Sequence, residues 1–161
     1  MIVYRNATFD DAEDIHKLCN YYATIGLMLP RSRNSIYENL RDYIVAAEDG
    51  KVIGCGALHF VWERLAEIRS LAIDAAHHKR GIGKKIVELL EQDGIERGIK
   101  MFFTLTYQPG FFLKCDYTEA PKDSLPQKVW KECVHCPQYP YCNEIAFIKK
   151  TPDYVPLPDE F

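Results

Sequence analysis

Residues 65–105 constrain the fold of this 161-residue chain more than any other segment. Apolar residues alternate over 65–73, which predicts a strand. A basic turn with two glycines at 80–84 then opens into residues 81–97, where apolar side chains recur on one helical face. An apolar run at 101–105 predicts a second strand. A strand, a crossover helix and a strand in this order predict two parallel neighbours in one sheet.

The flanking segments add elements on both sides of this unit. The sequence predicts a strand at 2–6, a helix from Thr8 that stops near Gly26, a helix at 34–42 capped by Asn34 or Ser35, strands at 43–47 and 51–61, a short helix at 111–114 and a last strand at 144–149. Asp49-Gly50 is a hairpin signal between two of these strands. The order β-α-α-β-β-β-α-β-α-β predicts an α/β (α+β) fold with a mixed sheet of about six or seven strands and flanking helices.

Length and composition limit the classes that this chain fits. We expect one domain over 1–150, with a Cys- and Pro-rich insertion at 118–143 and a Pro-rich tail at 151–161. A net charge of −3 argues against nucleic-acid partners. No apolar run approaches the roughly 18 residues of a membrane span, so no membrane partner is expected. The first residues do not read as a signal peptide, so a cytoplasmic location is expected.

The glycine turn has the properties of an anion site. Unpaired N–H groups, the positive end of a helix dipole and the side chains of Lys79, Arg80 and Lys84 come together there. A solvated helix start is the alternative, but cations at this end oppose the dipole unless an anion is bound. Glu67 lies a few residues upstream on the preceding strand. A phosphate cradle with a nearby carboxylate predicts an enzyme that uses a phosphorylated cofactor.

Two motifs connect the chain to a known superfamily. His78-Lys79-Arg80-Gly81-Ile82-Gly83 resembles the Gln/Arg-x-x-Gly-x-Gly/Ala signature of GNAT acetyl-CoA-dependent N-acetyltransferases, with His78 at the first position. The residues FFLKCDY at 111–117 resemble the family's Phe-Tyr-x-Lys-x-Gly-Phe, with Phe112 in place of tyrosine and Asp116 in place of glycine. The resemblance covers nearly the whole chain and implies the GNAT fold with acetyl-CoA as cosubstrate.

A narrower resemblance indicates the acceptor. Four stretches resemble short bacterial amino-acid acetyltransferases of the N-acetylglutamate synthase type. They are Leu29–Ser32, Gly54–His59, Ala66–Ala72 and Leu125–Trp130. This resemblance implies L-glutamate as the acceptor and a place in amino-acid and arginine biosynthesis. A GNAT enzyme for another small amine or a peptide N-terminus is one alternative, and a non-catalytic acyl-CoA or metal-responsive sensor is another.

The resemblance also assigns roles to residues. The implied cofactor-binding residues are Leu71, Ala72, Ile73, His78, Lys79, Arg80, Gly81, Ile82, Gly83 and Lys84. A bulge in the strand at 65–73 would let the backbone of residues 71–73 bond the pantetheine. Glu67 is the candidate general base, with an ordinary exposed strand glutamate as the alternative. Tyr107 is the candidate acid in place of the missing tyrosine, ahead of Tyr117 and His59.

Arginines supply the candidate acceptor site. Arg31 and Arg33 lie in a loop that covers the acceptor in this family, and Arg69 is a further candidate substrate-binding residue. Arginine binds carboxylates in bidentate fashion, and glutamate presents two of them. Of the loop pair, Arg31 is favoured, and the alternative is that one or both face water. We expect direct attack in a ternary complex on a small-molecule acceptor, with a homodimer left open.

Three cysteines follow zinc-knuckle spacing. Cys133, Cys136 and Cys142 form Cys-x2-Cys-x5-Cys with His135 between them. A structural zinc and a set of buried or redox-active thiols both fit this pattern. No metal site is therefore assigned.

Overall fold

The computed structural model describes residues 1–125 and 144–156, which divide into two compact units. The first unit contains Met1–His59 and Ile68–Asp93, and the second contains Phe60–Glu67 and the described part of Gly94–Phe161. Within the described residues, seven strands form one sheet in the order β1-β2-β3-β4-β5-β7-β6. The predicted α/β class with a mixed sheet is confirmed.

The helices and strands have the following bounds. The strands are β1 (Ile2–Asn6), β2 (Tyr43–Glu48), β3 (Lys51–Trp62), β4 (Leu65–Ile73), β5 (Met101–Thr106), β6 (Thr118–Glu119) and β7 (Ile145–Lys150). The helices are α1 (Ala12–Thr24), α2 (Arg33–Glu38), α3 (Ile82–Glu96) and α4 (Pro109–Lys114), with 3-10 turns η1 (Phe9–Asp11), η2 (Leu40–Asp42), η3 (Ala75–His77) and η4 (Lys122–Ser124).

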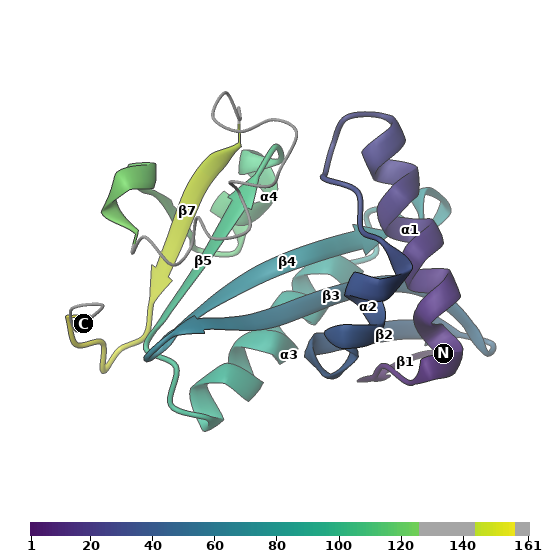
Figure 1. Ribbon diagram of the computed structural model, residues 1–161, viewed down its shortest axis with the longest axis horizontal. Coiled ribbons are helices and arrows are strands. Elements are labelled where there is room, and N and C mark those ends of the chain that lie inside the picture. Colours follow the sequence, from purple (N-terminus) through teal and green to yellow (C-terminus); the bar gives the residue numbers. More distant parts are fainter. Residues whose placement is uncertain (126–143, 157–161) are drawn as a thin grey trace. The chain divides into compact units, whose positions relative to one another are not determined.

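Helices cover both faces of the strands in the first unit (Figure 1). Alternate residues of β3 point to opposite faces. Cys55 lies in an apolar cluster with Cys19 of α1, and both side chains are fully buried. Gly54 and Gly56 face the other way, because a Cβ added at either would come within 3.5 Å or 2.7 Å of Ile86 on α3. These glycines let α3 approach β3 more closely than any larger residue would.

A tight hairpin joins β2 to β3. The turn residues Asp49 and Gly50 have φ values of +52° and +80°. Positive φ at both central residues is the requirement of a type I′ turn, which Asp-Gly meets readily. Glu48 pairs with Lys51 across the turn. The predicted hairpin is confirmed.

The second unit contains the parallel step. β4 pairs in parallel with β5, from Leu65 opposite Met101 to Glu67 opposite Phe103. β5 pairs antiparallel with β7 along its whole length, and β6 pairs with β7. One buried hydrophobic cluster of this unit contains Leu65, Met101, Phe103, Leu125 and Ala146. The parallel relation predicted across the helix is confirmed.

The second helix differs from the sequence prediction. It begins one residue earlier, at Arg33, because the Ser32 hydroxyl accepts from the Ser35 N–H at 3.0 Å and caps the helix. Asn34 and Ser35 were wrong as caps. The α-helix ends at Glu38, and a 3-10 turn covers Leu40–Asp42 where the prediction continued the helix.

The segment predicted to be irregular also contains regular structure. Within 118–143, Thr118–Glu119 form β6 and Lys122–Ser124 form a 3-10 turn. The remainder of that segment from residue 126 lies outside the described residues. The helix predicted from Thr8 begins as a 3-10 turn over Phe9–Asp11 and continues as α1 from Ala12, and the Asp11 carboxylate accepts from the Thr8 N–H at 2.7 Å in a capping box.

Candidate functional site

The turn between β4 and α3 presents main-chain donors in one place. Gly81 has a φ of +75°, and its carbonyl accepts a hydrogen bond from the Lys85 N–H at 3.0 Å. A Cβ added at Gly81 would meet nothing within 4 Å, so glycine is favoured there for its backbone conformation and not for space. The first N–H groups of the fifteen-residue α3 have no partner within the helix. This geometry suits an anion.

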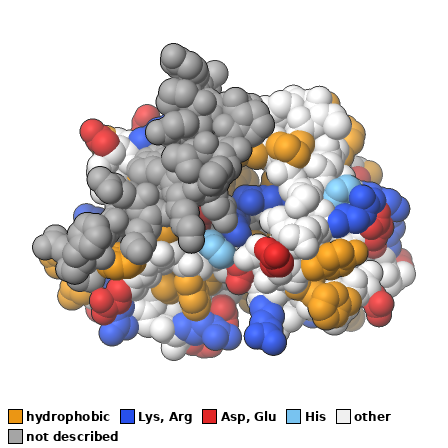
Figure 2. Space-filling model, viewed as in Figure 1, with side chains coloured by type: hydrophobic (Ala, Val, Ile, Leu, Met, Phe, Trp, Pro, Cys, Tyr) orange, Lys and Arg blue, Asp and Glu red, His pale blue; other side chains and the backbone are white. Residues whose placement is uncertain are grey.

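Basic side chains surround the same turn. Lys79, Arg80, Lys84 and Lys85 are exposed, and the first turn of α3 contains no acidic residue. Arg80 makes a bidentate ion pair with Glu48 of β2, with N···O distances of 3.2 Å and 2.8 Å. The hydrogen bond raises the pKa of Arg80 and lowers the pKa of Glu48. On the face that Figure 2 shows, described Lys and Arg side chains alternate with Asp and Glu side chains.

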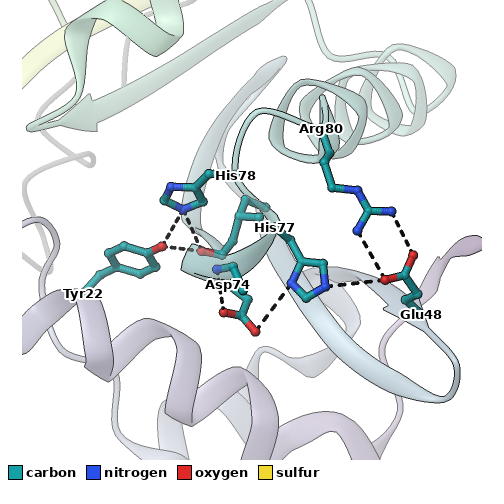
Figure 3. Close-up of polar contacts among 8 residues, drawn as sticks. Tyr22, Glu48, Asp74, His77, His78 and Arg80 are labelled. Carbon is teal, nitrogen blue, oxygen red and sulfur yellow. Dashed lines mark hydrogen bonds and ion pairs between the residues drawn. The ribbon is translucent and has the colours of Figure 1, made fainter.

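A tyrosine from α1 contacts the end of β4 (Figure 3). The Tyr22 hydroxyl donates to the Ile73 carbonyl and lies 2.7 Å from Nε2 of His78. The same Nε2 lies 3.1 Å from the Ile73 carbonyl. The Tyr22 and His78 rings stack with centroids 6.2 Å apart. His78, the unusual first residue of the glycine motif, therefore fixes the entry to the turn, and Tyr22 was missed by the sequence analysis.

A second histidine lies between two carboxylates. His77 Nδ1 is 3.7 Å from Oδ2 of Asp74, and its Nε2 is 3.5 Å from Oε1 of Glu48 (Figure 3). The Asp74 side chain also accepts from the Ala76 N–H at 3.2 Å. Glu48 thus contacts both His77 and Arg80, and links β2 to the turn.

The last residues of β4 alternate between the two faces of the first unit. The side chains of Leu71 and Ile73 lie against Gly56 and Gly54, on the face that α3 covers. Ala72 belongs to the apolar cluster on the α1 face. Ser70 interrupts the strand with a φ of +56°. A bulge at this point of the strand was expected from the family resemblance, and the left-handed Ser70 is an irregularity of that kind.

The two predicted catalytic residues belong to the second unit. Glu67 is half-buried on β4 and stands at the last position of the parallel ladder, opposite Phe103. Tyr107 is half-buried and directly follows β5. Each takes part in further interactions. Their roles stay predictions.

The three predicted substrate arginines belong to the first unit but differ in environment. Arg31 is half-buried, and Asn20 fixes its backbone by donating to its carbonyl at 2.9 Å and accepting from its N–H at 3.3 Å. Arg33 is exposed and makes a bidentate pair with Glu13 of α1, at 3.0 Å and 2.7 Å. Arg69 is only 8% exposed. Arg31 and Arg69 are thus more shielded from solvent than Arg33, and the substrate-binding roles of all three stay predictions.

Comparison with known proteins decides the family. A profile of the acetyltransferase (GNAT) family matches residues 9–117. This chain belongs to the GNAT acetyltransferase family. The GNAT fold expected from the two motifs is confirmed, and the protein is an acetyl-CoA-dependent acyltransferase.

Two relatives cover most of this GNAT domain. An uncharacterized N-acetyltransferase of Chlorobaculum tepidum is 43% identical over 145 residues, which cover 90% of this chain and 94% of the relative. An amino-acid acetyltransferase of Mycobacterium tuberculosis is 35% identical over 133 residues, which cover 81% of this chain and 76% of the relative. The resemblance to amino-acid acetyltransferases is thereby confirmed.

Solved GNAT structures have the same fold. A Mycobacterium tuberculosis protein in complex with CoA and NLQ matches with a TM-score of 0.80 at 29% identity, covering 92% of this chain and 99% of that one. N-acetylglutamate synthase of Neisseria gonorrhoeae, complexed with coenzyme A and N-acetyl-glutamate, matches with a TM-score of 0.84 at 22% identity. The second match covers 93% of this chain but 35% of the synthase, and it shows the fold alone.

Two further properties concern only the described residues. Within 1–125 and 144–156, no group of three or more His, Cys, Asp or Glu side chains is arranged to hold a metal ion. Cys133, Cys136 and Cys142, the candidate zinc ligands, lie outside these ranges. Every helix in the described part of the chain is too short or too polar to cross a membrane.

Proposed function

We propose that this enzyme acetylates the α-amino group of a free amino acid, with L-glutamate as the acceptor. The relative from Mycobacterium tuberculosis, an amino-acid acetyltransferase, supports this acceptor class. The observation that carries the choice of an acidic amino acid is the pair of shielded arginines, Arg31 and Arg69. Glutamate brings two carboxylates, and a guanidinium binds each of them through two parallel hydrogen bonds.

The residues of the turn fit the diphosphate of acetyl-CoA. The N–H groups at the start of α3 would hold the phosphate oxygens, and Gly81 supplies the left-handed conformation that aims them. Lys79, Lys84 and Arg80 would neutralise the charge, with Arg80 exchanging Glu48 for phosphate. The backbone of Leu71–Ile73 would pair with the amides of the pantetheine arm, as an added strand would.

Glu67 has the role of general base in this proposal. An α-ammonium group is mostly protonated at neutral pH, so its proton must leave before the nitrogen can attack. Glu67 takes that proton, directly or through a water molecule. The amine nitrogen then bonds to the thioester carbon, and a main-chain N–H near Leu71 or Ile73 polarises the carbonyl oxygen.

Departure of CoA completes the transfer. The carbon–sulfur bond breaks, and the thiolate takes a proton from the Tyr107 hydroxyl. The transfer occurs directly in a ternary complex. In this scheme Arg31 and Arg69 bind the acceptor carboxylates, and Arg33, which is exposed and paired with Glu13, does not. Such an enzyme would act in the cytoplasm and serve arginine biosynthesis.

Thiol release with a panel of amino acids, polyamines and peptides tests the acceptor. We expect turnover with L-glutamate, and turnover restricted to polyamines or peptide N-termini would remove the assignment. Glu67→Gln should lower kcat by about a hundredfold or more with CoA affinity retained, because it keeps the shape of the side chain but cannot accept the proton. Glu63→Gln, at an exposed glutamate beside the same strand, is the matched control and should retain full activity.

A further inference from the structure

Ser70 is strained in the middle of a strand. It is 5% exposed and has a φ of +56°, a conformation that residues other than glycine, asparagine and aspartate rarely adopt. Such strain persists only where the surroundings over-determine it, and it concentrates at functional sites. The surroundings of Ser70 therefore indicate what the strain serves.

Three buried side chains from three elements converge on Ser70. The Tyr43 hydroxyl of β2 donates to Oγ of Ser70 at 3.2 Å. The thiols of Cys55 on β3 and Cys19 on α1 both donate to the Ser70 carbonyl, at 3.4 Å and 3.9 Å. The two sulfur atoms are 4.0 Å apart, and neither thiol is exposed. We name Tyr43, Cys19 and Cys55 the Ser70 clamp.

Two of the three clamp donors, Tyr43 and Cys55, stay protonated at neutral pH. Burial raises the pKa of Tyr43 to about 12, so its hydroxyl remains protonated. The hydrogen bond with Cys19 and burial raise the pKa of Cys55, which keeps that thiol as a donor. The hydrogen bond with Cys55 lowers the pKa of Cys19, and the positive charge of Arg31 lowers it further. The same charge opposes the larger effect of burial on the pKa of Tyr43. One of the two arginines assigned to the acceptor therefore acts electrostatically on the clamp.

The left-handed conformation of Ser70 affects the orientation of Arg69, the residue before it. Leu71 and Ile73 are fixed on the α3 face by their fit against Gly56 and Gly54. In a regular strand, Arg69 would share that face with Leu71. A left-handed residue between them breaks this alternation, so Arg69 is not bound to the face of Leu71. Arg31 follows α1 in the chain, and its backbone is fixed by Asn20 of α1.

From this geometry we infer that the Ser70 clamp positions Arg69 for the acceptor amino acid. Ser70 held in the left-handed conformation releases Arg69 from the face of Leu71 while the backbone of Leu71–Ile73 stays available to acetyl-CoA. Tyr43, Cys19 and Cys55 are positioning residues that touch neither substrate. The inference rests on the proposed function, since it assigns Arg69 to the acceptor.

Substitutions at Ser70 separate backbone conformation from simple packing. Ser70→Gly retains access to positive φ, whereas Ser70→Val strongly disfavours it because valine is β-branched. We expect Ser70→Val to raise the KM for the amino acid by about tenfold or more, and Ser70→Gly by less than about threefold. The Kd for CoA, measured by calorimetry, should stay within about twofold in both, because Leu71 and Ile73 keep their fit against Gly56 and Gly54.

Tyr43→Phe provides a milder variant if Ser70→Val fails to fold. It removes one hydroxyl, and the acceptor KM should rise by about threefold with CoA affinity retained. Equal acceptor KM values for the glycine and valine variants would overturn the inference. A loss of CoA affinity in step with the acceptor constant would also overturn it, because it would show a purely structural role.

The same measurements distinguish this inference from the proposed function. Acceptor Kd values for the CoA-loaded protein are taken alongside turnover. A wild-type protein that binds glutamate without acetylating it refutes the proposed transfer, and the Ser70 comparison of Kd values still decides the inference. A wild-type protein that binds CoA but no amino acid refutes both.

Discussion

Gly81→Ala provides a quantitative test of the anion cradle. Gly81 has a φ of +75°, and a Cβ there would meet no atom within 4 Å, so the cost of alanine is conformational and not steric. An L-residue in the left-handed region costs about 1–2 kcal/mol. For a domain of this size, each 1 kcal/mol lowers Tm by about 2–4 °C, so we expect a decrease of roughly 2–8 °C.

The backbone strain at residue 81 also determines how much affinity for CoA the Gly81→Ala variant loses. Without ligand, the turn in Gly81→Ala can relax to negative φ and move the N–H groups away from their binding arrangement. Binding CoA must then restore the left-handed conformation, so the binding free energy falls by up to the strain. If the unliganded turn relaxes fully, the loss of about 1–2 kcal/mol falls on binding and raises the CoA Kd by about 5- to 30-fold, and the decrease in Tm is smaller by the share of strain so relieved. Isothermal titration calorimetry with CoA measures this change directly.

Gly26→Ala is the matched control for this prediction. Gly26 has a φ of +76°, and a Cβ there would also meet nothing within 4 Å. It follows α1 and lies outside the turn, so Gly26→Ala should lower Tm by a similar amount and leave the CoA Kd unchanged. Equal CoA affinity in Gly81→Ala and wild type, with the Tm lowered in both variants, would refute the reasoning.

Three further predictions concern packing, the turn and pH. Gly56→Ala places a Cβ 2.7 Å from Cγ2 of Ile86, so overpacking should lower the free energy of unfolding by about 1–3 kcal/mol, measured by urea titration. An unchanged midpoint of urea unfolding would contradict the close fit of α3 on β3. Tyr22→Phe removes the donor to the Ile73 carbonyl and should weaken CoA binding by about threefold in calorimetry, whereas Tyr21→Phe, at an exposed neighbour, should not. The hydrogen bond from Arg5 lowers the pKa of Asp11 in the folded protein. The ionised carboxylate therefore stabilises the fold fully at pH values above its unfolded pKa of about 3.9. That stabilisation is lost as the pH falls through the lower folded pKa. Asp11→Asn should therefore flatten the acid limb of the stability curve measured by urea unfolding, and an acid limb identical to that of wild type would contradict the assignment.

Local chemistry explains why much of the fold was predictable. Asp49-Gly50 predicts its own turn type, because few residue pairs accept positive φ at both positions. The strand, the glycine turn and the helix around Gly81 are likewise predicted from one continuous segment. The same segment predicts the parallel pairing of β4 with β5. Each of these predictions depends on neighbours in the sequence and not on distant contacts.

Predictions failed or were missing where several local choices competed or where the partner was distant. Ser32, Asn34 and Ser35 are all capable of capping a helix, and the hydrogen bond from Ser35 to Ser32 decided among them only in the folded chain. Tyr22 reads as one member of an apolar helix face, and nothing near it indicates that its hydroxyl reaches Ile73, 51 residues further on.

In the candidate site, too, features that depend on adjacent residues were predicted, and features that depend on contacts between distant elements were missed. The residues of the turn were predicted because a glycine motif and its cations are adjacent in sequence. The pairing of Arg80 with Glu48 and of Arg33 with Glu13 was missed, because each pair joins separate elements. No local signal showed that Ser70 would need two thiols and a tyrosine from three elements to hold its conformation.

Calorimetric titration of the wild-type protein with CoA tests the central claim most directly. The main-chain donors of α3 and the basic side chains around them predict saturable binding of one CoA per chain. Because cations contribute to the cradle, the affinity should fall as salt is raised. Well-folded protein that took up no CoA at any salt concentration would contradict the account.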